Sequence, residues 1–135
     1  MKAKPSEDRF FWRMVDDMGW GRDGNFDYDA IGAKAVALVK AAYNAGQAPV
    51  IAQSLWVAHR AKETALSRRL YRIFNGHGGD DSFDDFVNHI IGQGEEVYNR
   101  VMADPNEALA FLDSYRESFA YCWHGLYDFA GFDEA

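Results

Sequence analysis

The stretch between Asn75 and Glu96, NGHGGDDSFDDFVNHIIGQGEE, brings glycines, aspartates and two histidines close together in the sequence. Glycine amides can cradle a phosphate, alternating carboxylates can bind calcium, and an aspartate and a histidine on one helix face can share a metal. Each of these chemistries requires its own spacing, so the stretch can be compared with each in turn.

Calcium and phosphate both fit this stretch poorly. Counted from Asp80, the positions that need glycine and glutamate in an EF-hand loop hold Asp85 and Ile91. A count from the next residue also fails. A phosphate at the start of the following helix would meet a group of aspartates, whose carboxylates would repel it.

A transition-metal site is the alternative that the spacing leaves open. Asp85 and His89 are four residues apart and would share one helix face, with His77 and Asp81 nearby in the sequence. The HExxH pattern is absent and the single cysteine is remote. This alternative would make the protein a metal-dependent enzyme or a small-ligand binder that uses His77, Asp81, Asp85 and His89.

We interpret the same stretch as the end of one helix and the start of another. Ser82 would cap the new helix with Asp85 as the capping-box acid, or Asp81 would do so with Asp84. Their carboxylates would then lie at the positive end of the helix dipole. His89 would be a half-exposed helix residue. The left-handed turn that ends the preceding helix would come from Gly76, Gly78 or Gly79.

The hydrophobic pattern along the chain predicts helices and few strands. We expect an all-α fold, a compact single-domain bundle of five to six helices formed by residues 1–135, in which residues 126–135 form an acidic tail that frays. The predicted helices run from Ser6 to about Met18, Asp29 to Asn44 and Val50 to Phe74, then from Asp81 or Ser82, over EEVYNRVMA, and from Asp104 through Leu126.

Caps and apolar seams support these boundaries. We expect Ser6 and Asp29 to cap their helices and Gly46 to close the second, which its apolar residues would place near the centre of the bundle. Asp104 followed by Pro105 is the clearest helix start in the chain. The third helix would pack through Ile51, Leu55, Ala58, Ala65, Leu66, Leu70 and Ile73, and the last through Ala108, Phe111, Leu112, Tyr115, Phe119, Cys122, Trp123 and Leu126.

Composition narrows the class of protein. The chain has 135 residues, a net charge of −7 and one cysteine, Cys122. An acidic chain disfavours nonspecific binding to nucleic acids or to an anionic membrane. A lone cysteine forms no internal disulfide and fits a cytoplasmic location, and we expect it to be a buried structural thiol. The first residues do not have the pattern of a signal peptide.

Charge is divided unevenly along the chain. The segment from His59 to Arg72 is basic, whereas the segment from Asp80 to the end is mostly acidic. Such segments commonly form solvated faces, but they can also form patches for a partner of opposite charge. Trp20 lies in the loop sequence GWGRDG, which no helix pattern buries, and is therefore a candidate contact residue.

The segment LYRIFNGHGGDDSFDDFVNHIIGQGEEVYNRVMADPNEAL, from Leu70 to Leu109, resembles the bacterial domain-of-unknown-function family numbered 4240. The shared features are an asparagine–glycine turn, an acid pair, a phenylalanine–aspartate–x–phenylalanine helix, a glycine break and an alanine–aspartate–proline segment. DRFFWRMVDD is similar to the start of that family. The basic helix and the aromatic C-terminal part depart from it. The resemblance implies an intracellular bacterial helical domain and provides no catalytic residues.

These observations predict a non-enzymatic protein-interaction module, for example an acidic inhibitor or immunity-type protein, that binds another protein and needs no cofactor. We expect no binding to nucleic acid and no membrane segment. The candidate binding residues are Trp20, Arg60, Arg68, Arg69, Arg72, Asp81, Asp84 and Asp85.

Overall fold

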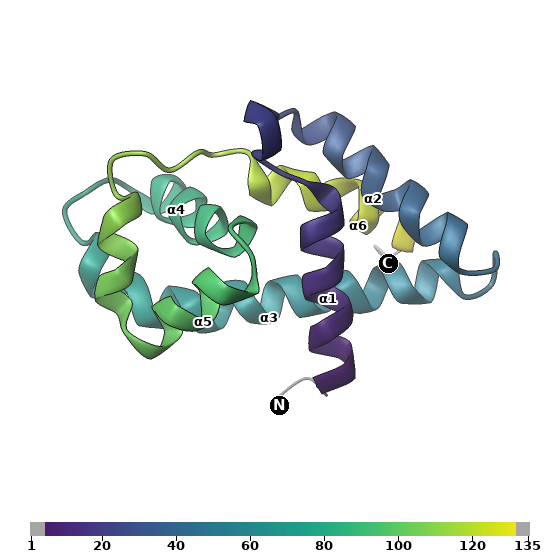
Figure 1. The fold of residues 1–135 in the computed structure, drawn as a ribbon, viewed down its shortest axis with the longest axis horizontal. Helices are drawn as coiled ribbons and strands as arrows, with labels where there is room; N and C mark the ends of the chain where they lie inside the picture. The colour runs from purple at the N-terminus through teal and green to yellow at the C-terminus, as the bar shows by residue number, and fades with distance from the viewer. Residues whose placement is uncertain (1–4, 132–135) are drawn as a thin grey trace. The chain divides into compact units, whose positions relative to one another are not determined.

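The structure, a computed structural model, describes residues 5–131 (Figure 1). Side chains are described from Arg9 onward. These residues form helices and no strand, which confirms the predicted all-α class. Counting the 3₁₀ helix η2 (Pro105–Phe111) with the six α-helices gives seven helices in this part of the chain, more than the five to six predicted. The chain divides into two compact units, Met1–Arg60 with Tyr121–Ala135, and Ala61–Ala120. The single domain stays a prediction.

The first unit contains helices from both ends of the chain. Its elements are α1 (Pro5–Met18), the short 3₁₀ helix η1 (Arg22–Gly24), α2 (Tyr28–Ala42), the first part of α3 (Ala48–Phe74), most of η3 (Phe119–Trp123) and α6 (His124–Ala130). α2 packs on both α1 and α6. α1 has the predicted extent, and the cap predicted for the Ser6 side chain lies outside the described side chains.

Three stacked rings form the centre of the first unit. The rings of Phe11 and Trp123 lie 5.2 Å apart and nearly parallel, and the imidazole of His59 lies 4.6 Å from Trp123. All three side chains are buried. The stack joins α1, α3 and η3 through face-to-face contacts between planar rings, which aliphatic side chains cannot make.

The boundaries of α2 differ from those predicted. Asp27, and not Asp29, is the N-cap, and its carboxylate accepts a hydrogen bond from the N–H of Ala30 at 3.2 Å. The backbone at Gly46 is not left-handed, so it does not close the helix. The helix ends instead at Ala42, and the C-cap Tyr43 has extended backbone.

The predicted central position of α2 is also wrong. Its buried residues are confined to one side, because the alanines between them face solvent. Alanine is apolar enough to raise the average hydrophobicity of a helix but small enough to be exposed at little cost. The buried residues of α2 are Ile31, Gly32, Ala35 and Val39.

The second unit contains the rest of α3, α4 (Asp80–Gly92), α5 (Glu95–Ala103) and η2. α4 packs on α5 and η2, and α5 packs on η2. The rings of Phe74 and Phe86 stack at 5.2 Å, and the Tyr115 ring meets both at its edge. The Arg69 side chain donates to the carbonyl oxygen of Met102 at 3.0 Å, which fastens α3 to the end of α5.

The predicted long last helix is wrong, although its start is confirmed. The Asp104 carboxylate accepts a hydrogen bond from the N–H of Asn106, and Pro105 follows it as predicted. The helix is a 3₁₀ helix that ends at Phe111, and residues 112–118 form turns and irregular backbone. The N–H of Arg116 binds a side chain of α4, so it is not available to an α-helical ladder.

The prediction that the C-terminal residues fray is wrong for the part of the chain that α6 occupies. α6 extends to Ala130 and buries Leu126 and Ala130, and Gly131 ends it in the left-handed conformation. The predicted frayed tail from residue 126 is therefore helical as far as residue 130. Residues 132–135 lie outside the described residues.

Candidate functional site

The turn between α3 and α4 ends one helix and starts the next, as predicted, but with different contacts. Gly76 has a φ of +87°, and the N–H of His77 binds the carbonyl oxygen of Phe74. Gly79 is the N-cap of α4 and provides no side-chain cap. Ser82 lies inside the helix, where its side chain packs against Gly78. The predicted side-chain caps, from Ser82 or from Asp81, are therefore wrong.

The carboxylates at the start of α4 differ in environment. Asp80, Asp81 and Asp84 are exposed, and the first two lie in the first turn, where the helix dipole favours negative charge. Asp85 is half-buried. Burial raises its pKa to about 6, and the carboxylates of Glu117, Asp81 and Asp84 add to that rise. The ionised form of Asp85 therefore opposes folding, and the prediction that it stabilises the helix start is wrong.

His89 is buried, which corrects the expectation that it is half-exposed. Its side chain is 6% exposed, and its Nδ1 atom accepts a hydrogen bond from the N–H of Arg116 at 2.9 Å. The Nε2 atom lies 3.3 Å from the side-chain amide of Gln93. Burial, together with the charge of Arg116, lowers the pKa of His89 to about 4. The neutral imidazole is thus a structural group of the second unit.

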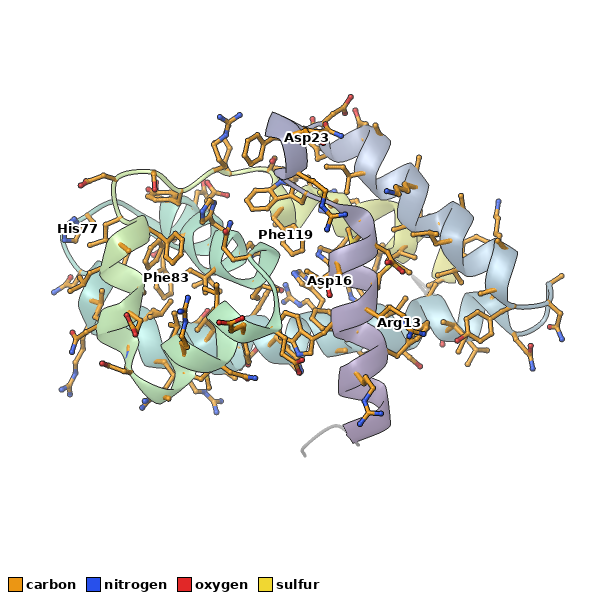
Figure 2. All side chains as sticks on the ribbon, in the orientation of Figure 1. Arg13, Asp16, Asp23, His77, Phe83 and Phe119 are labelled. Carbon is orange, nitrogen blue, oxygen red and sulfur yellow. The ribbon has the colours of Figure 1, made fainter. Side chains whose placement is uncertain are left out.

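The alternative metal site is not assembled. His77 is exposed on the turn before α4 (Figure 2), whereas both ring nitrogens of His89 face other groups. Among residues 5–131, no group of three or more His, Cys, Asp or Glu side chains is arranged to hold a metal ion. Asp81 and Asp85 therefore act in the described structure as neighbouring charges.

The four arginines of the predicted basic face are all exposed on α3. Arg60 belongs to the first unit, and the other three belong to the second. Arg69 is directed toward the end of α5 by its hydrogen bond to Met102. Arg68 and Arg72, one turn apart, lie opposite the buried positions Leu66 and Leu70 of the same helix.

An exposed tyrosine precedes Arg72 in the sequence and follows Arg68 by three residues. Tyr71 is 69% exposed, and its ring meets the ring of Phe83 in α4 edge to face, with 6.4 Å between the ring centres. This contact places the last turns of α3 beside the first turns of α4, where the exposed aspartates lie. We call this surface the α3–α4 corner and define it by Arg68, Tyr71, Arg72, Asp80, Asp81 and Asp84.

Trp20 is not the exposed contact residue that the loop sequence predicts. It is 7% exposed, and its ring packs edge to face on Phe26, with 5.1 Å between the ring centres. The loop folds back around the short 3₁₀ helix η1, so that two aromatic residues six apart in the sequence meet. Helical periodicity cannot detect such a contact.

Sequence reasoning also missed polar residues on the buried side of α3. The buried side follows Ala48, Ala52, Leu55, His59, Lys62, Leu66, Leu70 and Phe74, whereas Ile51, Ala58, Ala65 and Ile73 are half-buried. The Nζ atom of Lys62 lies 5.9 Å from the centre of the Tyr98 ring. The spacings of three and four that run through His59 and Lys62 are the helical signal for the buried side. Because these two residues are polar, the hydrophobic pattern alone does not reveal that signal.

Cys122 is a buried structural thiol, as predicted. Burial raises its pKa to about 12, so the thiol stays protonated at neutral pH. His124, two residues further along the chain, is exposed and contacts the ring of Tyr121. These two residues therefore do not form a nucleophile and base pair.

The fold and these sites define a class, an all-α protein with a mixed-charge surface at a helix corner. The chain matches the family described as protein of unknown function (DUF4240) over residues 7–128, and it belongs to that family. This match extends well beyond the segment from Leu70 to Leu109 that carries the resemblance in the sequence. No curated protein and no solved structure matches the chain. Within residues 5–131, no helix has the length and apolar character needed to cross a membrane.

Proposed function

We propose that the chain is a non-enzymatic protein-interaction module whose partner-facing surface is the α3–α4 corner. The observation that carries this proposal is the 69% exposure of Tyr71, which precedes the exposed Arg72 and follows the exposed Arg68 by three residues. Tyrosine and arginine are the residues that most often supply binding energy at protein interfaces. An exposed tyrosine also offers a large rigid surface at a low cost in conformational entropy.

Charge at the corner indicates the kind of partner. Arg68 and Arg72 would face carboxylates of the partner. Tyr71 would enter a shallow apolar recess of the partner that lies between these carboxylates. The exposed aspartates at the start of α4 would face cations and fix the orientation. A nucleic acid is a poorer match, because Asp80, Asp81 and Asp84 would repel its phosphates.

The setting that we propose is the cytoplasm of a bacterium. One buried cysteine supports a reducing compartment, where no disulfide is needed for stability. We do not narrow the proposal to an acidic inhibitor or immunity-type protein, because the corner presents two arginines and an exposed tyrosine together with its three aspartates.

Site-directed photocrosslinking in the native host tests the proposal. A benzophenone amino acid at Tyr71 should crosslink a defined protein, whereas the same group at Val57, which is 58% exposed on the same helix, should not. The double substitution Arg68→Glu and Arg72→Glu should weaken binding of that protein about tenfold or more. The matched control is Arg13→Glu with Arg100→Glu, which changes the net charge equally at exposed positions outside the corner.

The carboxylates of the partner that face Arg68 and Arg72 can then be replaced by basic residues. If this replacement restores binding to the double variant, the two arginines make the contact. Equal crosslinking from positions 57 and 71, or an equal loss of affinity in the control double variant, would remove the basis of the proposal.

A further inference from the structure

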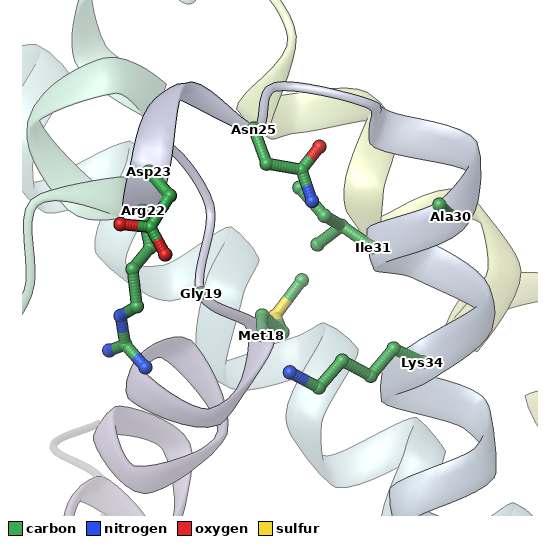
Figure 3. A pocket seen from close by; sticks show the side chains of 8 residues that line it. All are labelled: Met18, Gly19, Arg22, Asp23, Asn25, Ala30, Ile31 and Lys34. Carbon is green, nitrogen blue, oxygen red and sulfur yellow. The ribbon is translucent and has the colours of Figure 1, made fainter.

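The loop that holds Trp20 forms one wall of a pocket in the first unit. The pocket lies between the end of α1, η1 and the start of α2, and its volume is about 300 Å³ (Figure 3). That volume is at the lower end of the range found for small-molecule sites. A ligand that fills it would be a small metabolite with few heavy atoms.

The wall formed by the loop has an uncommon backbone conformation. Gly19, Gly21, Asp23 and Gly24 all have left-handed backbone, and Asp23 is the one residue other than glycine with a positive φ in the described chain. The N–H of Gly21 binds the carbonyl oxygen of Asn25 at 2.7 Å. A Cβ atom at Gly21 would lie 3.1 Å from the Phe26 ring. Aspartate adopts left-handed backbone more readily than most residues other than glycine. The conformation is still sparsely populated, and sparsely populated backbone conformations are concentrated at functional sites.

Two cations line the pocket from different elements. The Arg22 guanidinium donates to the carbonyl oxygen of Asp16 at 3.1 Å, which holds the side chain against the end of α1. Lys34 extends from α2 with its ammonium group beside Met18 (Figure 3). One acid, Asp23, also lines the pocket. The lining therefore carries more positive than negative charge, although the whole chain has a net charge of −7.

The remaining lining suits an aliphatic group. Met18, Ala30 and Ile31 contribute apolar surface, and the side chain of Asn25 provides a neutral polar group. A carboxylate can bind a guanidinium and an ammonium together through charge-assisted hydrogen bonds. From these observations we propose that the pocket binds a small organic carboxylate with a short aliphatic portion, held by Arg22 and Lys34. This site is separate from the α3–α4 corner and does not depend on it.

Titration of the whole chain with isovalerate, followed in proton–nitrogen correlation spectra, tests the proposal. The backbone amides of Gly19, Gly21, Gly24 and Lys34 should shift in a saturable manner, with a dissociation constant on the order of millimolar. Isovaleramide, which has the same shape without the charge, should bind at least about tenfold more weakly.

Lys34→Gln should weaken isovalerate binding roughly tenfold, because one charge-assisted hydrogen bond is lost. Lys40→Gln is the matched control on the same helix, at an exposed position that does not line the pocket. Arg22→Gln provides a second variant, and well-dispersed spectra verify that each variant is folded. Equal shifts with the amide, no saturation, or equal affinities of the Lys34→Gln, Arg22→Gln and Lys40→Gln proteins would overturn the proposal.

Discussion

The Nδ1 atom of His89 accepts a hydrogen bond from the backbone N–H of Arg116 at 2.9 Å. This bond joins the middle of α4 to the irregular segment that follows η2. An imidazole can accept at Nδ1 only when that nitrogen carries no proton, and burial favours the neutral ring. The folded second unit therefore contains an imidazole that resists protonation, with a pKa of about 4.

We expect acidification to destabilise the protein through His89. The unfolded chain takes up the proton near the ordinary pKa of 6.5, whereas the folded chain takes it up near 4. The stabilisation is thus complete above pH 6.5 and is lost as the pH falls toward 4. The loss is on the order of 3 kcal/mol in the free energy of unfolding. Urea unfolding at a series of pH values measures it, and a titration followed by NMR gives the pKa directly.

The variant His89→Leu separates this effect from those of other groups. It should cost about 1–3 kcal/mol at pH 7, because the buried N–H of Arg116 loses its acceptor. Its free energy of unfolding should then fall less than that of the wild type between pH 6.5 and 4. An identical pH dependence in both proteins would show that His89 is not the responsible group.

Asp85 should respond to pH in the opposite direction. Its folded pKa of about 6 exceeds the ordinary value of 3.8, so its unfavourable contribution is absent below pH 3.8 and complete above pH 6. Asp85→Asn should therefore stabilise the protein at pH 7 by about 1 kcal/mol, a value reduced for solvent screening. Below pH 3.8 the variant and the wild type should have similar stability. Urea unfolding at the two pH values measures the difference.

Asp80→Asn is the matched control for Asp85→Asn. Asp80 lies in the first turn of the same helix but is exposed. Its removal should cost about 0.3–1 kcal/mol at pH 7, because its charge interacts favourably with the helix dipole. Stabilisation by both substitutions would show that general repulsion among the acids, and not the burial of Asp85, determines the effect.

Local signals account for the parts of the fold that could be predicted from the sequence. The end of α3 just before Gly76, the break before α5 and the start at Asp104 and Pro105 each depend on a few adjacent residues. Glycine with left-handed backbone and proline in the first turn have the same effect in most proteins. The exposure of the arginines of α3 also followed from their position off the apolar seam.

Contacts between distant residues account for what could not be predicted. The partner of His89 is 27 residues away, and the same contact interrupts the long helix expected after Asp104. Trp20 is buried by a loop that folds on Phe26, and Asp85 acquires its raised pKa partly from Glu117. The pocket beside that loop arises from left-handed residues whose conformation the sequence suggests only at the glycines. None of these contacts has a periodic signature.

Gly76 should be required for a normal end of α3. With a φ of +87°, its replacement by alanine should cost about 1–2 kcal/mol in the free energy of unfolding. Open space surrounds the position, so backbone conformation and not crowding produces the cost. Gly76→Asn should recover part of the loss, because asparagine tolerates left-handed backbone. Urea unfolding of the three proteins measures the effect, and equal losses with alanine and asparagine would contradict the explanation.

Gly32 should be required for a different reason, the close approach of α2 to η3 and α6. A Cβ atom at this position would lie 2.9 Å from the carbonyl oxygen of Cys122, and backbone cannot move away as a flexible side chain can. Overpacking of this kind costs about 1–3 kcal/mol, which exceeds the gain of up to about 1 kcal/mol in helix propensity from alanine. Gly32→Ala should therefore lower the free energy of unfolding by about 1–2 kcal/mol.

Gly46→Ala is the matched control for the substitution at Gly32. Gly46 does not have left-handed backbone, and the nearest atom to an added Cβ is the Asn44 side-chain oxygen at 3.6 Å. This substitution should leave the stability unchanged or raise it by about 0.4–1 kcal/mol, because alanine restricts the unfolded chain. Thermal and urea unfolding of both variants measure the contrast. A stable Gly32→Ala protein would mean that α2 can move away from Cys122 at little cost, and that the packing of the first unit does not depend on this contact.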